Sequence, residues 1–180
     1  MTDYNKLYEE AEMVARVHHA NKMYDIYPYI KHVLDVVEVL KRHGYSGDDL
    51  IAGALHDTIE DSDLTYNKIN KAFGLVVAEI VLACTDPSDL RNRKEKKIRM
   101  LEKMKAYPRA IPVKLADRVA NMAHSIRMQN LDKVLMYMKE HVELEFNLRT
   151  QGEHDGLWND LNTLFGKGRE LLTVKHIKYD

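Results

Sequence analysis

The sequence has little of what marks secreted, membrane or disordered proteins. One cysteine, Cys84, among 180 residues excludes an internal disulfide and favours a reducing cytoplasm. Only 4 prolines and 8 glycines are present, so we expect neither disorder nor a flexible linker. No apolar run approaches the roughly 18 residues of a membrane-spanning helix, and the acidic residues 1–12 differ from a secretory signal. We therefore expect a cytoplasmic protein without membrane contact.

Neither sign of charge is in excess. The 27 Lys and Arg residues are balanced by 28 Asp and Glu residues, for a formal net charge of −1. A nucleic-acid groove normally leaves a basic balance, so we expect no nucleic-acid partner. The 45% of hydrophobic and 31% of charged residues are typical of a helix-rich globular chain. We predict a single domain over residues 1–180, large enough to bury one core without disulfides.

Helical periodicity, by contrast, is present along most of the chain. Apolar residues recur at spacings of three and four, and only 173–179 alternates as a half-buried strand would. The predicted helices cover approximately residues 4–18, 30–43, 46–61, 65–74, 76–84, 98–107, 113–126 and 131–148. We therefore predict an all-α fold, in which the tail 166–180 is the part that the pattern determines least.

Capping residues indicate where several of these helices begin and end. Thr2 or Asp3 can open the first helix, and Gly44 can end the second in a left-handed conformation. Ser46 can open a third helix, which we expect to continue without a break to Asp61. On such a helix, residues four apart lie one above the other.

The segment ALHDTIED, residues 54–61, contains the residues with the most chemical content. On an unbroken helix His56 would lie beneath Glu60, and Asp57 beneath Asp61. A buried histidine among carboxylates is unfavourable unless a cation or hydrogen bonds compensate. Imidazole and carboxylate ligands suit Mn²⁺, Fe²⁺, Zn²⁺ or Co²⁺ better than Ca²⁺. By itself, the segment is also compatible with a run of surface polar residues.

Two further residues could complete a metal site. His32 lies on the apolar face of the second helix, where a core histidine is the ordinary interpretation. Asp117 lies in the segment VKLADRVAN, where an ion pair with Lys114 or Arg118 is an equal alternative. With the His-Asp pair of residues 56 and 57, these two residues form the ordered pattern H…HD…D.

This pattern resembles the HD phosphohydrolase superfamily. The stretches PYIKH, ALHDTIEDS, CTD and VKLADRVANM are similar to the hydrolase domain of the RelA/SpoT proteins. In length the chain resembles the small alarmone hydrolases, such as the metazoan SpoT homologue, and the similarity covers roughly residues 4–150. The resemblance implies a single-domain HD fold. It also implies Mn²⁺-dependent removal of the 3′-pyrophosphate from guanosine tetra- or pentaphosphate (ppGpp or pppGpp), which leaves GDP or GTP.

The resemblance also implies roles for individual residues. The metal ligands would be His32, His56, Asp57 and Asp117. The acidic pair that positions and activates the attacking water would be Glu60 and Asp61. The substrate contacts would be Lys22, Asn121 and Tyr137. These roles are chemically coherent, because a metal lowers the pKa of a water molecule and a nearby carboxylate can accept its proton.

One position departs from the family pattern. Met23 stands where the family tends to place an arginine that stacks on the guanine or grips phosphate, and few side chains can replace that planar cation. A second enzymatic interpretation therefore stays open: an HD-type phosphatase or pyrophosphatase for a nucleoside 5′-phosphate, a dNTP or NADPH. A non-catalytic nucleotide-binding module is a third. The basic residues 91–97 could either reach phosphates or begin a solvated helix, and the oligomeric state is left open.

Overall fold

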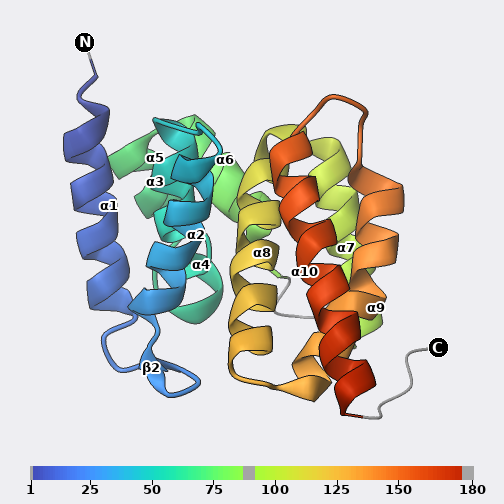
Figure 1. The fold of residues 1–180 in the computed structure, drawn as a ribbon. Coiled ribbons are helices and arrows are strands. Elements are labelled where there is room, and N and C mark those ends of the chain that lie inside the picture. The colour runs from blue at the N-terminus through green and yellow to red at the C-terminus, as the bar shows by residue number, and fades with distance from the viewer. Residues whose placement is uncertain (1, 87–91, 176–180) are drawn as a thin grey trace.

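The computed structural model describes residues 2–86 and 92–175, and within these ranges it confirms the expected all-α fold (Figure 1). The helices are α1 (Tyr4–His18), α2 (Ile30–Arg42), α3 (Asp48–Leu55), α4 (Thr58–Asp61), α5 (Tyr66–Phe73), α6 (Leu75–Cys84), α7 (Arg93–Ala106), α8 (Ile111–Arg127), α9 (Leu131–Leu148) and α10 (Asp155–Val174). A short 3-10 turn, η1 (Pro108–Ala110), precedes α8. No helix in the described ranges is long and apolar enough to cross a membrane.

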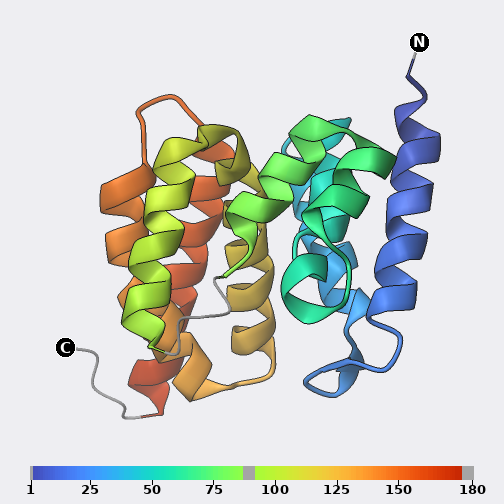
Figure 2. The ribbon, with the colours of Figure 1, turned by 180° about the vertical axis from the view of Figure 1, so that it is seen from behind.

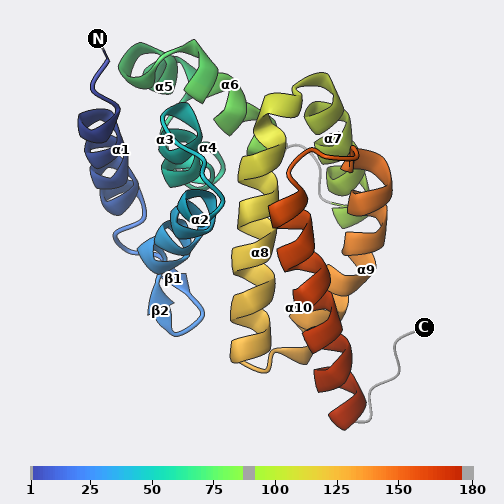
Figure 3. The same cartoon turned by 45° about the horizontal axis from the view of Figure 1, so that its top comes forward.

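Helices α1 to α6 form one side of the molecule and α7 to α10 the other (Figures 1 and 2). The long helix α8 lies at the seam, where it packs against α2 on one side and against α9 and α10 on the other. Figure 3 shows α5 and α6 lying across the end of α3. The main apolar core runs through both sides, from Val36 in α2 to Leu115 in α8 and Trp158 in α10. Any site at the seam is therefore held by a continuous core.

Residues between α1 and α2 form a small hairpin that the apolar pattern did not predict. Its strands are β1 (Met23–Tyr24) and β2 (Tyr27–Pro28), which pair antiparallel around a two-residue turn. Asp25 in that turn has a φ of 59°, a conformation that aspartate tolerates better than most residues. A two-residue strand is too short to produce a detectable alternation, so no pattern of residues predicts this hairpin.

Most predicted helix ends are close to the observed ones. The Asp3 side chain caps α1, and Gly44, with a φ of 79°, follows α2. The predicted cap at Ser46 is wrong, because Gly47 immediately precedes α3. Gly47 has a φ of 57°, and a Cβ there would lie 3.3 Å from the ring of Tyr4. Glycine is therefore favoured at this position both by its backbone conformation and by a close neighbour.

The expectation of an unbroken helix from Ser46 to Asp61 is also wrong. Helix α3 ends at Leu55, and α4 begins only at Thr58. Between them Asp57 has φ −102° and ψ −1°, outside the usual helical values. The expected stacking of residues four apart on one straight helix is therefore absent from this segment.

Side chains replace the backbone hydrogen bonds that an unbroken helix would make here. The Nδ1 of His56 bonds the Gly53 carbonyl at 2.8 Å, and the Thr58 hydroxyl donates to the Leu55 carbonyl at 2.6 Å. Both carbonyls belong to the last turn of α3, which otherwise leaves them without helical partners. At the break, the His56 side chain is therefore bonded to the last turn of α3.

Two other predictions differ from the structure near the chain's less regular parts. Helix α10 continues to Val174 and the Thr173 hydroxyl donates to the Arg169 carbonyl, so the strand suggested for 173–179 is wrong where it is described. The rest of that segment, 176–180, lies outside the described residues. Helix α7 begins at Arg93, earlier than predicted, which makes most of the basic stretch helical.

Candidate active site

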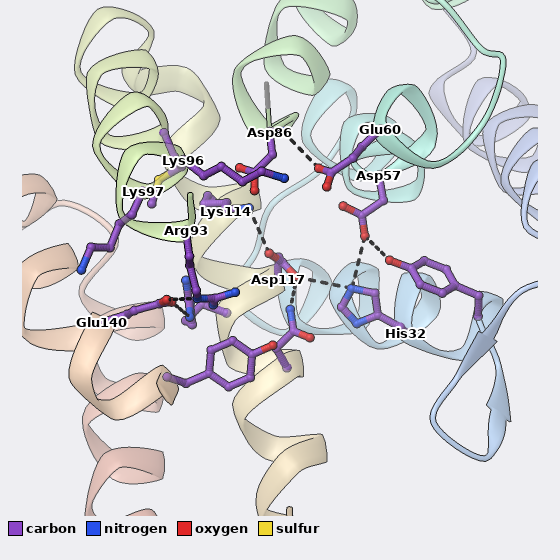
Figure 4. Close-up of a pocket in the computed structure, with 15 residues that line it drawn as sticks. His32, Asp57, Glu60, Asp86, Arg93, Lys96, Lys97, Lys114, Asp117 and Glu140 are labelled. Atoms are coloured by element: carbon purple, nitrogen blue, oxygen red, sulfur yellow. Dashed lines mark hydrogen bonds and ion pairs between the residues drawn. The ribbon is translucent and has the colours of Figure 1, made fainter. Parts of the chain in front are cut away.

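Four side chains from three separate parts of the sequence meet at the seam between α2 and α8. The Nε2 of His32 lies 3.3 Å from Asp117 Oδ1 and 3.7 Å from Asp57 Oδ2 (Figure 4). The Nε2 of His56 lies 2.9 Å from Asp57 Oδ2 and 3.9 Å from Asp117 Oδ1. The structure thus brings together the four residues of the H…HD…D pattern.

A close approach of α3 to α2 brings the two histidines near each other. A Cβ added to Gly53 in α3 would lie 2.6 Å from Leu40 Cδ1 in α2. A larger residue at this position would therefore displace the Leu40 side chain or move the two helices apart. The hydrogen bond that His56 Nδ1 donates to the Gly53 carbonyl then holds the imidazole, whose ring centroid lies 5.3 Å from that of His32. The second histidine is therefore positioned by backbone rather than by other side chains.

The donor atoms of this cluster fit a divalent cation. His32, His56 and Asp57 each offer one ligand atom within 4.8 Å of the others. A carbonyl oxygen can only accept, so the Nδ1 of His56 carries a proton. Its buried Nε2 faces Asp57 Oδ2 at 2.9 Å; burial lowers the pKa of His56, but the carboxylates of Asp57 and Asp117 outweigh it and raise the pKa, so a cation would take the place of a proton on this nitrogen. A histidine whose Nδ1 is fixed by a backbone carbonyl and whose Nε2 faces other ligand atoms is the usual arrangement of a metal ligand.

The charges of the cluster reinforce one another. Burial lowers the pKa of His32, but the carboxylates of Asp117 and Asp57 outweigh it and raise the pKa to about 9. Burial raises the pKa of Asp57, but His56 and His32 outweigh it and hold the pKa well below its usual range. The pKa of Asp117 is likewise lowered: Lys114 and the histidines outweigh the effect of its burial. Without a metal, the carboxylates are therefore ionised and His32 holds a proton that a cation would displace.

Three further side chains hold the two aspartates in place. The hydroxyl of Tyr29 donates to Asp57 Oδ2 at 2.6 Å. The ammonium of Lys114 lies 3.3 Å from Asp117 Oδ2, while the Nδ2 of Asn121 donates to Asp117 Oδ1. The ion pair of Asp117 with Lys114, an alternative that the sequence left open, is thus formed. It uses Oδ2 and leaves Oδ1 facing the histidines, so the ion pair and a metal site are compatible.

A pocket of about 460 Å³ opens beside this cluster. Its lining includes Tyr29, His32, Asp57, Glu60, Asp86, Arg93, Lys96, Lys97, Met100, Lys114, Asp117, Arg118, Asn121, Tyr137 and Glu140. Five of these residues are lysines or arginines of α7 and α8. Lys114 belongs to the His/Asp cluster, because it pairs with Asp117, and we call the other four, Arg93, Lys96, Lys97 and Arg118, the cationic wall. Figure 4 shows Arg93, Lys96 and Lys97 on the side of the pocket away from the hairpin. A pocket with a His/Asp cluster at one side and a cationic wall at the other is suited to a polyanion.

A family model described as HD domain matches residues 11–139, from α1 into α9. The chain belongs to the HD-domain family. The match includes all four residues of the cluster, so the pattern H…HD…D lies within the HD domain itself.

Several curated proteins are similar to this HD domain. The guanosine-3′,5′-bis(diphosphate) 3′-pyrophosphohydrolase MESH1 of Drosophila melanogaster is 33% identical over 97 residues, which are 53% of this chain and 54% of that protein. The human MESH1 is 32% identical over 121 residues, 65% of this chain and 68% of that protein. The similarity to the Drosophila protein thus spans about half of its length.

A solved structure has the same fold. It is described as a metazoan orthologue of SpoT that hydrolyses ppGpp, with a TM-score of 0.71 and 24% sequence identity. The superposition covers 99% of this chain and 100% of that one. The arrangement of helices around the seam is therefore that of an HD fold over nearly the whole chain.

Of the other predicted site residues, some line the pocket of the HD domain and others do not. Glu60, Asn121 and Tyr137 line the pocket. Asp61 is the last residue of α4, and its side chain lies outside what the structure describes. Lys22 is not among the lining residues found in the described ranges; its ammonium lies 6.0 Å from the ring centroid of Tyr29, which does line the pocket.

Glu60 faces the pocket between α4 and the end of α6. Its Oε2 accepts a hydrogen bond from the backbone N–H of Asp86 at 3.1 Å. Burial raises the pKa of Glu60, and the negative charges of Asp86 and Asp57 add to the effect, although the bond from Asp86 opposes it. A carboxylate whose pKa is raised accepts a proton more readily than an ordinary carboxylate.

Two arginines of the HD domain share one carboxylate, a contact that the sequence did not predict. Arg93 Nε and Arg118 Nη1 each donate to the carboxylate of Glu140 at 2.7 Å. The guanidinium of Arg118 also lies 4.7 Å from the ring centroid of Tyr137. No periodicity connects α7, α8 and α9, so only the packed structure joins these residues. Tyr29, three residues before His32 at the start of α2, could have been found from its spacing.

Proposed function

We propose that this HD domain hydrolyses the 3′-pyrophosphate of guanosine tetra- or pentaphosphate and leaves GDP or GTP and pyrophosphate. The observation that carries the proposal is the convergence of two histidines and two aspartates on a pocket whose other side is a cationic wall. The names of the Drosophila and human relatives describe the same reaction. In a substrate with two pyrophosphate groups, the metal would act on the group that is cleaved, and the basic side chains would bind the other group.

The metal site would consist of His32, His56, Asp57 and Asp117, with Mn²⁺ as the proposed ion. The Nε2 of His56, which faces Asp57 Oδ2 at 2.9 Å, and the ionised carboxylates support this assignment. When bound, a divalent ion supplies Lewis-acid chemistry, because it polarises a phosphoryl oxygen and lowers the pKa of a water molecule. Two imidazoles and two carboxylates match the preferences of Mn²⁺ or a similar transition metal.

The proton would be carried by Glu60, with Asp61 as its partner in the acidic pair. The attacking water loses a proton to Glu60 while its oxygen forms the new bond to phosphorus. The bond from phosphorus to the 3′-oxygen breaks, and protonated Glu60 returns the proton to the nucleoside side. The raised pKa of Glu60 suits it for both transfers.

The remaining lining residues would bind the substrate. The cationic wall is suited to phosphate groups, because guanidinium and ammonium groups form strong charge-assisted hydrogen bonds with them. Asn121 in α8 and Tyr137 in α9, which both line the pocket, would contact the nucleoside. Lys22 would reach a phosphate from the hairpin side, where it lies near Tyr29.

One observation favours a second candidate, the hydrolysis of another nucleotide. Met23 is 60% exposed on the hairpin and offers no planar cation for the base. Less selective recognition of guanine would admit a nucleoside 5′-phosphate, a dNTP or NADPH.

The test is a Mn²⁺-dependent product assay with ppGpp, pppGpp, dNTPs, nucleoside monophosphates and NADPH, run on the wild type and on Asp57→Ala and Glu60→Ala. We expect ppGpp and pppGpp to release pyrophosphate, and both variants to be inactive. Turnover of another nucleotide in the absence of ppGpp hydrolysis would favour the second candidate. Binding of nucleotide without turnover, equal in all three proteins, would mean a non-catalytic module.

A further inference from the structure

Tyr24, in the hairpin, contacts one residue of the proposed nucleoside site, Asn121, and one of the proposed metal site, His32. Its hydroxyl donates to Asn121 Oδ1 at 2.5 Å. Its ring stacks on the imidazole of His32, with centroids 4.7 Å apart and planes 25° apart. The two contacts reach from β1 to α8 and to α2, so this one residue joins three elements around the pocket.

The contact with Asn121 determines how the amide group is oriented. A tyrosine hydroxyl donates to the amide oxygen, and the amide nitrogen then donates to Asp117 Oδ1 on the other side. A carboxylate oxygen can only accept, so the two contacts require the same orientation of the amide. Loss of the hydroxyl would leave Asn121 held at one end only.

The hairpin that carries Tyr24 is itself tied to α8. The Nη2 of Arg127 donates to His124 Nδ1 at 3.0 Å. A neutral His124 therefore carries its proton on Nε2, which lies 3.4 Å from Asp25 Oδ2 in the hairpin turn. Asp117, Asn121 and His124 follow one another at spacings of four and three along α8, so one face of that helix holds both the hairpin and the pocket.

The ring of Tyr24 is already engaged within the protein. Besides His32, it has His124 at a centroid distance of 4.5 Å and the ammonium of Lys133 at 5.5 Å. A side chain that stacks on a nucleotide base needs a face turned to the pocket, whereas this ring packs on protein groups and is absent from the pocket lining in the described residues. Its role is therefore one of support rather than direct recognition.

We infer that Tyr24 is a positioning residue that couples the nucleoside end of the pocket to the metal end, through Asn121 and His32. This inference rests on the proposed roles of those two residues. The hydroxyl would act on substrate binding by fixing the Asn121 amide. The ring would act on metal binding by fixing the plane of the His32 imidazole, as the partners of metal ligands usually do.

Two substitutions separate these contacts. Tyr24→Phe keeps the ring and removes the hydroxyl, so we expect KM for ppGpp to rise about tenfold with kcat and Mn²⁺ affinity within about twofold of wild type. Tyr24→Ala removes both, so we expect the same rise in KM together with about tenfold weaker Mn²⁺ binding by calorimetry. Tyr27→Phe is the matched control, because Tyr27 is the cross-strand partner of Tyr24, and we expect wild-type values.

A double-mutant cycle shows whether Tyr24 acts through Asn121. In an Asn121→Ala background, Tyr24→Phe should have no further effect on KM. The inference is overturned if Tyr24→Phe leaves KM unchanged, or if its effect is the same in both backgrounds.

A readout that needs no turnover separates this inference from the proposed function. The side-chain amide of Asn121 gives its own NMR signals, and Tyr24→Phe should shift them while Tyr27→Phe does not. If the wild type does not hydrolyse ppGpp, the proposed function fails, and the amide signals and the Mn²⁺ affinities still decide the positioning role. Unchanged amide signals in Tyr24→Phe would contradict it.

Discussion

The side chains of His32 and His56 expose 2% and 1% of their surface, whereas that of Arg93, across the pocket, exposes 60%. The histidines lie in the core between α2 and α3, and a backbone carbonyl fixes one of them. Arg93 and the neighbouring lysines project from the surface of α7 on long, flexible stems. The metal side of the pocket is therefore preorganised, and the part of the cationic wall on α7 is not. Arg118, in α8, is 11% exposed and is held by Glu140.

This difference agrees with the chemistry proposed for each side. Charge that develops during a reaction is stabilised best by groups that do not need to reorient. Binding of a flexible polyphosphate tolerates side chains that adjust. Substitutions at the metal side should therefore affect turnover strongly, and substitutions on the cationic wall should affect binding more weakly.

The largest effect is expected for Asp57→Asn. This change keeps the size of the side chain and an oxygen for the Tyr29 hydroxyl, but it removes the negative charge between the two histidines. We expect kcat/KM to fall about 10³-fold or more, because a bound metal contributes several kcal/mol. Mn²⁺ affinity, measured by calorimetry, should fall with it. Asp35→Asn is the control, because Asp35 lies in α2 and does not belong to the proposed metal site, and an equal loss there would contradict the comparison.

The second-largest effect is expected for Glu60→Gln. This change removes the proton acceptor without removing a proposed metal ligand, so we expect kcat to fall about 10²- to 10⁴-fold. Mn²⁺ affinity should stay within about threefold of wild type. A parallel loss of metal affinity would place Glu60 among the ligands instead. Single-turnover measurements with Mn²⁺ at saturation distinguish the two outcomes.

A smaller effect is expected on the cationic wall. Lys96→Ala removes one ammonium group from the pocket lining, so we expect KM to rise about tenfold and kcat to change little. The effect should shrink at high salt, because the contact is exposed to screening. Lys94→Ala is the matched control, since Lys94 is exposed on the same helix and does not line the pocket. A large fall in kcat in Lys96→Ala would contradict the expectation that the cationic wall contributes to binding and the metal side to turnover.

The smallest effect is expected on stability, from Glu140→Gln. Burial raises the pKa of Glu140, but Arg118 and Arg93 outweigh it, so its pKa lies below the usual value of 4.5. The ion pairs therefore stabilise the fold above about pH 4.5, and that contribution is lost as the pH falls through the lower folded value.

We expect Glu140→Gln to lower the free energy of unfolding at pH 7 by about 1 kcal/mol, a modest value because Arg93 is largely exposed. The difference from wild type should shrink on acidification below about pH 4. Urea titrations at pH 7 and pH 3.5 measure it. A difference that stays constant between the two pH values would mean that the carboxylate charge is not responsible.

Much of the architecture could be read from the sequence because helices leave a strong local pattern. The helix 131–148 was predicted with its observed ends; residue type alone narrowed the cap of the first helix to Thr2 or Asp3, of which Asp3 is the observed one, and predicted Gly44 after the second. The prediction failed where side chains compete with the backbone for hydrogen bonds. The break after Leu55 is such a place, since Thr58 bonds the carbonyl that a continued helix would have used.

The residues of the candidate metal site could be named from the sequence, because His32, His56, Asp57 and Asp117 form an ordered pattern that resembles the HD phosphohydrolases; by periodicity alone, His32 and Asp117 had equally ordinary interpretations. How these residues meet, and what surrounds them, came from the packing of the helices. The pocket draws on α2, α4, α7, α8 and α9, and the contacts of Tyr24 and Glu140 cross from one element to another. Such contacts depend on how helices pack, and periodicity within a single helix carries no information about its partners.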